Sequence, residues 1–207
     1  MNAIPSIQKI GGMAAFMNAG IALATLATAV FLIGFSAIAN PNELIDLAIR
    51  NPTPLLIQDG LKVASAVISA LLVATFTHYL RGENPALLSV TAGFGFLAIF
   101  CLLGNAALSF YGILQIPTIG EVTDSVSQLN HMIGMLAVVA ILLDGLWLLL
   151  VHGIALKNQK LPRFLCYLGL TMGVLSLIPI LGIVVLLIGL IWSVWIGKIW
   201  LTAAPGD

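Results

Sequence analysis

The sequence predicts an all-α protein, a polytopic transmembrane helical bundle of six spans with both termini in the cytoplasm. Of the 207 residues, 60% are apolar and only 8% are charged, whereas soluble domains carry roughly 25% charged residues. Long apolar runs also follow one another after short connectors, and each run can supply the ~20 residues that cross a bilayer. The placement of lysine and arginine then gives the orientation. One transmembrane domain covering residues 1–207 is therefore expected.

Polar or proline-containing breaks delimit the six predicted spans. The sequence reads NP at 40–41, NPTP at 51–54 and RGENP at 81–85, and such clusters interrupt helices. The apolar run after Arg163 is too long for one crossing and sufficient for two, with a break at IPILG, residues 178–182. The predicted spans are residues 8–39, 55–80, 86–113, 125–156, 162–178 and 182–201.

Two segments carry additional expectations about packing. Residues 42–50, NELIDLAIR, mix apolar and charged residues as a short amphipathic helix on the membrane surface would, although a plain loop is the alternative. The span at 86–113 is rich in glycine and alanine, which let helices approach closely in lipid, so it should lie inside the bundle. The spacing of Gly169 and Gly173 fits the same close packing, either within the chain or between two copies.

The cationic residues predict the orientation, because cytoplasmic connectors are enriched in lysine and arginine. With six spans and a cytoplasmic N-terminus, six of the eight cationic residues lie on the cytoplasmic side, whereas five spans would place Lys198 outside. Trp192, Trp195 and Trp200 cluster toward the cytoplasmic end of the last span, as interfacial anchors do. The six cytoplasmic residues are Lys9, Arg81, Lys157, Lys160, Arg163 and Lys198.

Asp144 is the most informative polar residue inside an apolar run. It precedes Lys157 by 13 residues, or ~20 Å along a helix, well inside a hydrocarbon layer of ~30 Å. An unpaired carboxylate is costly there. Asp144 is thus a candidate proton-linked or substrate-contacting group, or else a neutral acid that is hydrogen-bonded to a neighbouring helix. Asn18, Thr25 and Thr28 of the first span lie at suitable depth for the second role.

Asp59, Lys62 and Asn105 are expected to lie together near the outer surface. Lys62 precedes Arg81 by 19 residues, which places it ~28 Å from the cytoplasmic side and away from Asp144. Asp59 is three residues before Lys62, the spacing of a local ion pair. Asn105 reaches a similar depth on the next span. The three residues predict either a structural cluster or the outer mouth of a ligand path.

The histidines raise the possibility of a haem, since His78 and His152 lie at similar depths on different spans and could be axial ligands of a b-type haem. Interfacial structural histidines are the alternative. The sequence contains no phosphate-binding glycine loop, nucleophile elbow, paired metal-binding histidines or Cys-x-x-Cys. It therefore predicts no metal site and no enzyme, and a net charge of zero predicts no nucleic-acid partner.

Residues 145–175, GLWLLLVHGIALKNQKLPRFLCYLGLTMGVL, resemble a bacterial family of six-span membrane proteins that is known only as a domain of unknown function. Leu161-Pro162-Arg163 and Leu168-Gly169 match the family's basic connector and fifth span, while HYLRGENPALLSVTAGFGFLA and KIGGMAAF match more loosely. Trp147 departs from the family, which often has histidine there. The resemblance implies architecture rather than activity, and a bacterial inner membrane or an internal membrane derived from it.

The leading hypothesis for function is a non-enzymatic structural or accessory component of a membrane, either as a subunit of a larger complex or as a homo-oligomer. The absence of a convergent polar site in the sequence favours it. A small transporter or channel is the alternative, with Asp144 as the coupling carboxylate and Asp59, Lys62 and Asn105 at its entrance. A haem- or pigment-binding protein is a more remote alternative, and no other cofactor is expected.

Overall fold

The computed structural model describes residues 7–34, 36–37, 40–82, 84–119 and 124–202, and every regular element in these ranges is helical. The predicted all-α class is thus confirmed. The helices, in chain order, are α1 (Ile7–Ala27), the π-helical η1 (Thr28–Ile33), α3 (Pro41–Arg50), α4 (Thr53–Tyr79), α5 (Pro85–Ile119), α6 (Asp124–Lys157), α7 (Arg163–Ser176), the 3₁₀ turn η2 (Pro179–Leu181) and α8 (Gly182–Thr202).

Within the described residues, five helical stretches are long and apolar enough to span a membrane, as expected of an integral membrane protein. They are Ile7–Ile33, Thr53–Tyr79, Pro85–Leu114, Gln128–Lys157 and Gly182–Thr202. The remaining candidate, predicted at 162–178, corresponds to α7, which has 14 residues. At 1.5 Å per residue it is ~21 Å long, short of a ~30 Å hydrocarbon layer.

The first span ends earlier than the sequence suggested. The helix continues through η1 to Ile33, and Gly34 follows with φ of 87°, a left-handed conformation that glycine adopts without strain. The Gly34 N–H donates to the Ala29 carbonyl at 2.9 Å and so closes the π-helical segment. The amphipathic segment after it forms the helix α3.

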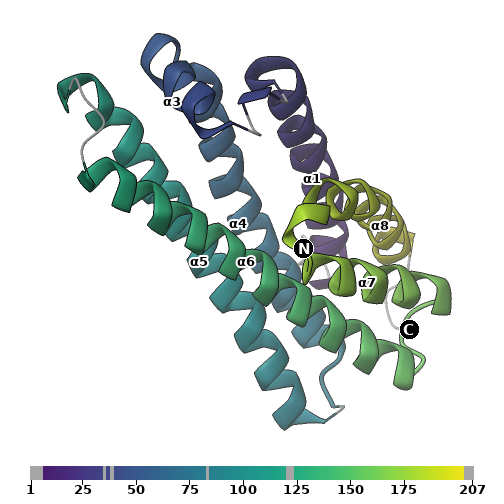
Figure 1. Ribbon diagram of the computed structural model, residues 1–207. Helices are drawn as coiled ribbons and strands as arrows, with labels where there is room; N and C mark the ends of the chain where they lie inside the picture. Colours follow the sequence, from purple (N-terminus) through teal and green to yellow (C-terminus); the bar gives the residue numbers. More distant parts are fainter. Residues whose placement is uncertain (1–6, 35, 38–39, 83, 120–123, 203–207) are drawn as a thin grey trace, which may run out of the picture.

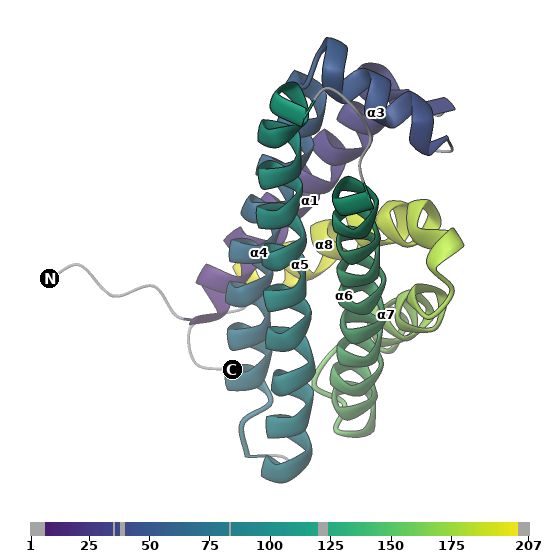
Figure 2. The same cartoon turned by 60° about the vertical axis from the view of Figure 1, so that its left-hand side comes forward.

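The helices pack in a closed order around a common interior (Figure 1). α1 packs against α4, α4 against α5, α5 against α6, α6 against α7, and α7 against α8, which returns to α1. α4, α5 and α6 are the long helices of this arrangement, and each runs antiparallel to the one before it (Figure 2). α3 lies near one end of these helices.

An aromatic cluster fills the interior at the level of Phe76. The fully buried ring of Phe76 has its centroid 5.8 Å from both Trp147 and His152 of α6, 5.9 Å from Trp192 and 4.7 Å from Trp200 of α8. The prediction that the tryptophans of α8 are interfacial anchors is therefore wrong for Trp192 and Trp200, which face this cluster instead.

Matched glycines allow two of the helix pairs to approach closely. A Cβ built on Gly12 of α1 would lie 3.1 Å from the carbonyl oxygen of Gly197 on α8, and the reverse distance is the same. Gly145 of α6 and Gly173 of α7 show the same reciprocal contact at 3.0 and 2.9 Å. Small residues drive such packing in lipid. The Gly169 to Gly173 spacing thus serves a contact within the chain.

The glycine-rich helix α5 is only partly enclosed. A Cβ on Gly95 would meet Val73 of α4 at 2.7 Å and Trp147 of α6 at 2.9 Å, so small residues do face both neighbours. On the other side, Leu97 is 50% and Phe100 69% exposed. The expectation that this span lies inside the bundle is wrong, because Gly95 and Ala106 are buried while Gly93 and Ala107 stay exposed beside a broad apolar face.

One end of the bundle collects most of the cationic residues. The Tyr79 hydroxyl at the end of α4 donates to the Lys160 carbonyl in the α6–α7 connector at 2.6 Å. Near the start of α1, Gly11 packs against Thr75 of α4 and Trp200 of α8. The beginning of α1 and the ends of α4, α6 and α8 therefore share one end of the molecule. We call it the cationic end, because these segments and the connectors that follow α4 and α6, up to the first residue of α7, contain Lys9, Arg81, Lys157, Lys160, Arg163 and Lys198.

Candidate functional site

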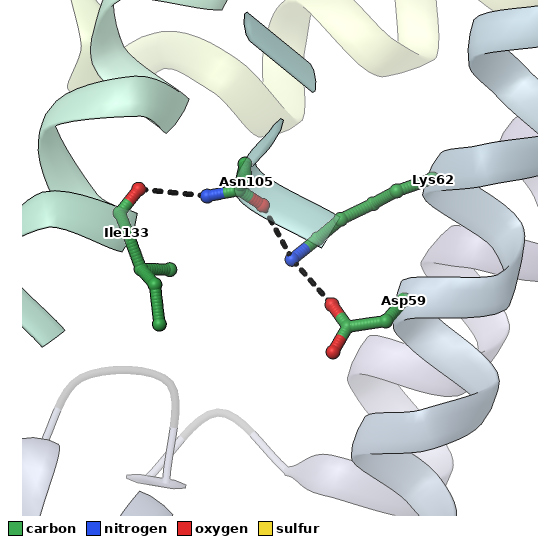
Figure 3. Close-up of polar contacts among 4 residues, drawn as sticks. All are labelled: Asp59, Lys62, Asn105 and Ile133. Carbon is green, nitrogen blue, oxygen red and sulfur yellow. Dashed lines mark hydrogen bonds and ion pairs between the residues drawn. The ribbon is translucent and has the colours of Figure 1, made fainter. Parts of the chain in front are cut away.

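A chain of polar contacts links α4, α5 and α6 (Figure 3). The Lys62 ammonium donates to Asp59 Oδ1 at 2.7 Å and to Asn105 Oδ1 at 2.9 Å. The Asn105 amide then donates through Nδ2 to the Ile133 carbonyl of α6 at 2.7 Å. The structure thus brings together Asp59, Lys62 and Asn105, the three residues that depth along the sequence had grouped. We refer to Asp59, Lys62, Asn105 and Ile133 together as the α4–α5–α6 polar network.

Helix geometry explains how the network forms. Asp59 and Lys62 lie three residues apart and so share one face of α4, while the packing of α5 against α4 brings Asn105 opposite them. Asp59 lies six residues after the first residue of α4, Thr53, or ~9 Å along the helix. The network is therefore near the end of the bundle that is remote from the cationic end.

Burial distinguishes the members of this network. Asp59 and Asn105 are each 2% exposed, whereas the Lys62 side chain keeps 29% of its surface exposed. A carboxylate that is buried to this degree needs a cation and hydrogen bonds, and Lys62 supplies both to Oδ1. Within the described residues, Asp59 Oδ2 is buried without a hydrogen-bond partner. One acceptor of the network is thus still available.

Asp144 lies apart from this network. It is 11 residues beyond Ile133 on α6, or ~16 Å along the helix axis. It shares a helix face with Ala140, Trp147 and Leu148, all of which are buried, but is itself only half-buried. Among the described residues it makes no hydrogen bond and no ion pair.

Asn18 of the first span is not the hydrogen-bond partner of Asp144 that the sequence suggests. The Asn18 amide of α1 instead donates to the Ser193 hydroxyl of α8 at 2.9 Å. α1 packs between α4 and α8, whereas α6 packs between α5 and α7.

His152 is a fully buried junction between three helices. Its Nε2 accepts a hydrogen bond from Trp192 Nε1 of α8 at 2.9 Å. Because Nε2 accepts, the proton of a neutral ring is on Nδ1, which donates to the Leu148 carbonyl at 2.9 Å. Gly169 of α7 covers the ring, and any Cβ there would collide with it. Both ring nitrogens are thus used within the protein.

His78 does not converge with His152. His78 is exposed and comes two residues after Phe76, which packs against the His152 ring. Residues two apart on a helix point roughly 200° apart, so His78 faces away from the interior. A haem held by both histidines does not fit this arrangement. The described residues also contain no group of three or more His, Cys, Asp or Glu side chains that could hold a metal ion.

The sequence did not predict the hydrogen bonds from Trp192 to His152 and from Asn18 to Ser193. Each joins two polar groups from apolar runs, and isolated Asn, Ser and His residues in such runs are the usual signal for interhelical hydrogen bonds. The signal identifies the residues but not the pairs, because pairing depends on which helices are neighbours.

The comparisons with known proteins add no relative, since no family model, curated protein or solved structure matches the chain. The resemblance of residues 145–175 to a bacterial six-span family therefore stays a prediction.

Proposed function

We propose that this chain is a non-enzymatic integral membrane protein that acts as a structural or accessory component, within a larger membrane complex or as a homo-oligomer. The observation that carries the proposal is how its buried and half-buried polar groups are used. Asn18 bonds α1 to α8, His152 bonds α6 to α8, and Lys62 with Asn105 bonds α4 to α5 and α6. In the part of the chain that the structure describes, these groups connect helices and do not converge on a reaction centre.

The chemistry of these pairs supports the same proposal. Paired acid–base or nucleophilic chemistry needs two groups within hydrogen-bond reach of one reacting atom. Asp144 and the α4–α5–α6 polar network are ~16 Å apart along α6, and His152 has both nitrogens engaged within the fold. A rigid bundle whose apolar flanks face lipid or other helices suits a scaffold.

Purification in a mild detergent tests this function. We expect the tagged protein, extracted from its own membrane at native expression level, to migrate on a native gel as an assembly larger than the 21.8 kDa chain. Mass spectrometry of that band would identify the other subunits or a homo-oligomer. A monomer without co-purifying protein in several mild detergents would count against the proposal.

For topology, we propose six spans with both termini in the cytoplasm of a bacterial inner membrane or a derived internal membrane. The gathering of six cationic residues at one end supports this orientation. In this arrangement the 14-residue α7 crosses from the cytoplasmic side where the bilayer thins to match it, and α8 returns to that side. A cysteine introduced at Asp207, which lies outside the described residues, should react with impermeant reagents from the cytoplasmic face alone.

A small transporter or channel is the second candidate, and one observation favours it. Asp144 is half-buried on the interior side of α6 and has no partner among the described residues, which is typical of a carboxylate that exchanges a proton or ion. Under this candidate, Asp144→Asn should abolish proton flux in liposomes that contain a pH-sensitive dye, because the amide cannot carry the exchanged proton. Unchanged flux with intact folding would remove Asp144 from the mechanism.

A further inference from the structure

A cleft at the cationic end opens between the end of α4 and the beginning of α5. Its volume is about 470 Å³, within the size range of small-molecule sites. Residues on both sides of the 81–85 turn line it, among them Ala74, His78, Arg81, Leu88, Ser89 and Phe96. The cleft is distinct from the α4–α5–α6 polar network, which lies near the opposite end of the bundle.

The lining changes in polarity along the bundle axis. Arg81, His78 and Ser89 form a polar rim at the turn. Ala74 is seven residues before Arg81, and Phe96 is 11 residues after Pro85, so they lie roughly 10 and 16 Å deeper along their helices. The cleft therefore runs from a cationic rim to an apolar floor, the same order as a phospholipid from headgroup to acyl chain.

The rim has the groups that an anionic headgroup needs. The Arg81 guanidinium makes no ion pair or side-chain hydrogen bond among the described residues, and it is exposed. Arginine binds phosphate through two parallel N–H donors. His78 adds exposed ring nitrogens. The Ser89 hydroxyl donates to the Pro85 carbonyl at 2.9 Å, and this bond fixes the Ser89 side chain against the first turn of α5.

The surroundings favour lipid over a soluble anion. Ala74, His78, Ser89 and Phe96 are exposed on the outer side of α4 and α5, so the cleft opens laterally. Basic pockets between spans on the cytoplasmic side are a known setting for anionic headgroups. We propose that this cleft binds one anionic phospholipid, with its phosphate at Arg81 and an acyl chain along Ala74, Leu88 and Phe96.

Native mass spectrometry of the detergent-purified protein, titrated with dioleoylphosphatidylglycerol, tests this site. We expect one tightly retained phosphatidylglycerol, and weaker retention of dioleoylphosphatidylcholine. Arg81→Gln should weaken phosphatidylglycerol binding by about fivefold, the factor expected from one basic side chain at an anionic membrane surface. Ala74→Leu should also weaken it, because the added side chain fills the apolar part of the cleft without a change in charge.

Lys198→Gln is the matched control, since Lys198 is exposed at the same end of the bundle but does not line the cleft. It should bind phosphatidylglycerol as the wild type does. The lipid-free thermal midpoint of each variant verifies folding. Three results would overturn the proposal: unchanged binding in both cleft variants, an equal loss in Lys198→Gln, or displacement of the lipid by millimolar inorganic phosphate, which would indicate an anion site without an acyl-chain requirement.

Discussion

Gly169→Ala should be strongly destabilising and lower the free energy of unfolding by about 3 kcal/mol. A Cβ at this position would collide with Cδ2, Nε2 and Cε1 of the buried His152 ring. The ring cannot retreat, because it is hydrogen-bonded to Trp192 and Leu148 and packed on Phe76. Either α7 moves away from α6 or the bond from Trp192 breaks. Unfolding in mixed micelles, followed by tryptophan fluorescence, measures the effect.

Gly153→Ala is the control for the glycine effect. Gly153 is next to His152 on α6, and a Cβ there would meet nothing within 4 Å. Because alanine is the better helix former by about 1 kcal/mol, this variant should be as stable as the wild type or slightly more stable. Equal stability of Gly169→Ala and Gly153→Ala would contradict the close contact between α7 and the His152 ring.

Lys62→Met should be comparably harmful, with a loss of about 3 kcal/mol in the free energy of unfolding. The methionine keeps most of the side-chain volume but removes the ammonium that bonds to Asp59 and Asn105. The Asp59 carboxylate, which is 2% exposed, is then buried without a counter-charge. The Asn105 Oδ1 atom also loses the hydrogen bond that the Lys62 ammonium donates. Thermal midpoints in detergent, with equilibrium unfolding for the magnitude, measure the loss.

A double variant and an exposed pair complete this test. Asp59→Asn combined with Lys62→Met removes both charges, so it should recover most of the stability that Lys62→Met loses. The Asp46–Arg50 pair on α3 has a separation of 4.0 Å and side chains that are 65% and 82% exposed. Arg50→Met should therefore change stability by no more than about 0.5 kcal/mol. Additive losses in the double variant would contradict a coupled network.

The sequence specified positions along the membrane normal better than positions around the helices. Depth counted from Arg81 and from the 81–85 turn was enough to group Lys62 with Asn105, because a helix rises by a fixed 1.5 Å per residue. The same counting matched Asp144 with Asn18, yet Asn18 bonds to Ser193. Depth alone does not identify the neighbouring helix, because the neighbour depends on the order in which all the helices pack around the interior.

Two other differences have related causes. Position along α8 predicts that Trp192 and Trp200 are interfacial anchors, but both point inward to Phe76, because position along a helix does not determine which face a residue occupies. The apolar run after Arg163 was long enough for two crossings, but the break at Pro179 divides it unequally, into 14 residues for α7 and 21 for α8. Hydropathy locates the apolar run, whereas the position of the turn determines how its residues are divided between α7 and α8.

If the buried and half-buried polar groups join helices and do not line an aqueous path, water-soluble reagents should not reach position 144 from either side of the membrane. An Asp144→Cys variant in a Cys101→Ser background, in which Cys166 is fully buried, would be exposed to a membrane-impermeant maleimide from each side. A cysteine at Asp207 serves as the reporter for the cytoplasmic side. We expect no modification at position 144 from either side. Modification there at a rate comparable to the reporter would contradict it and establish a water-filled route.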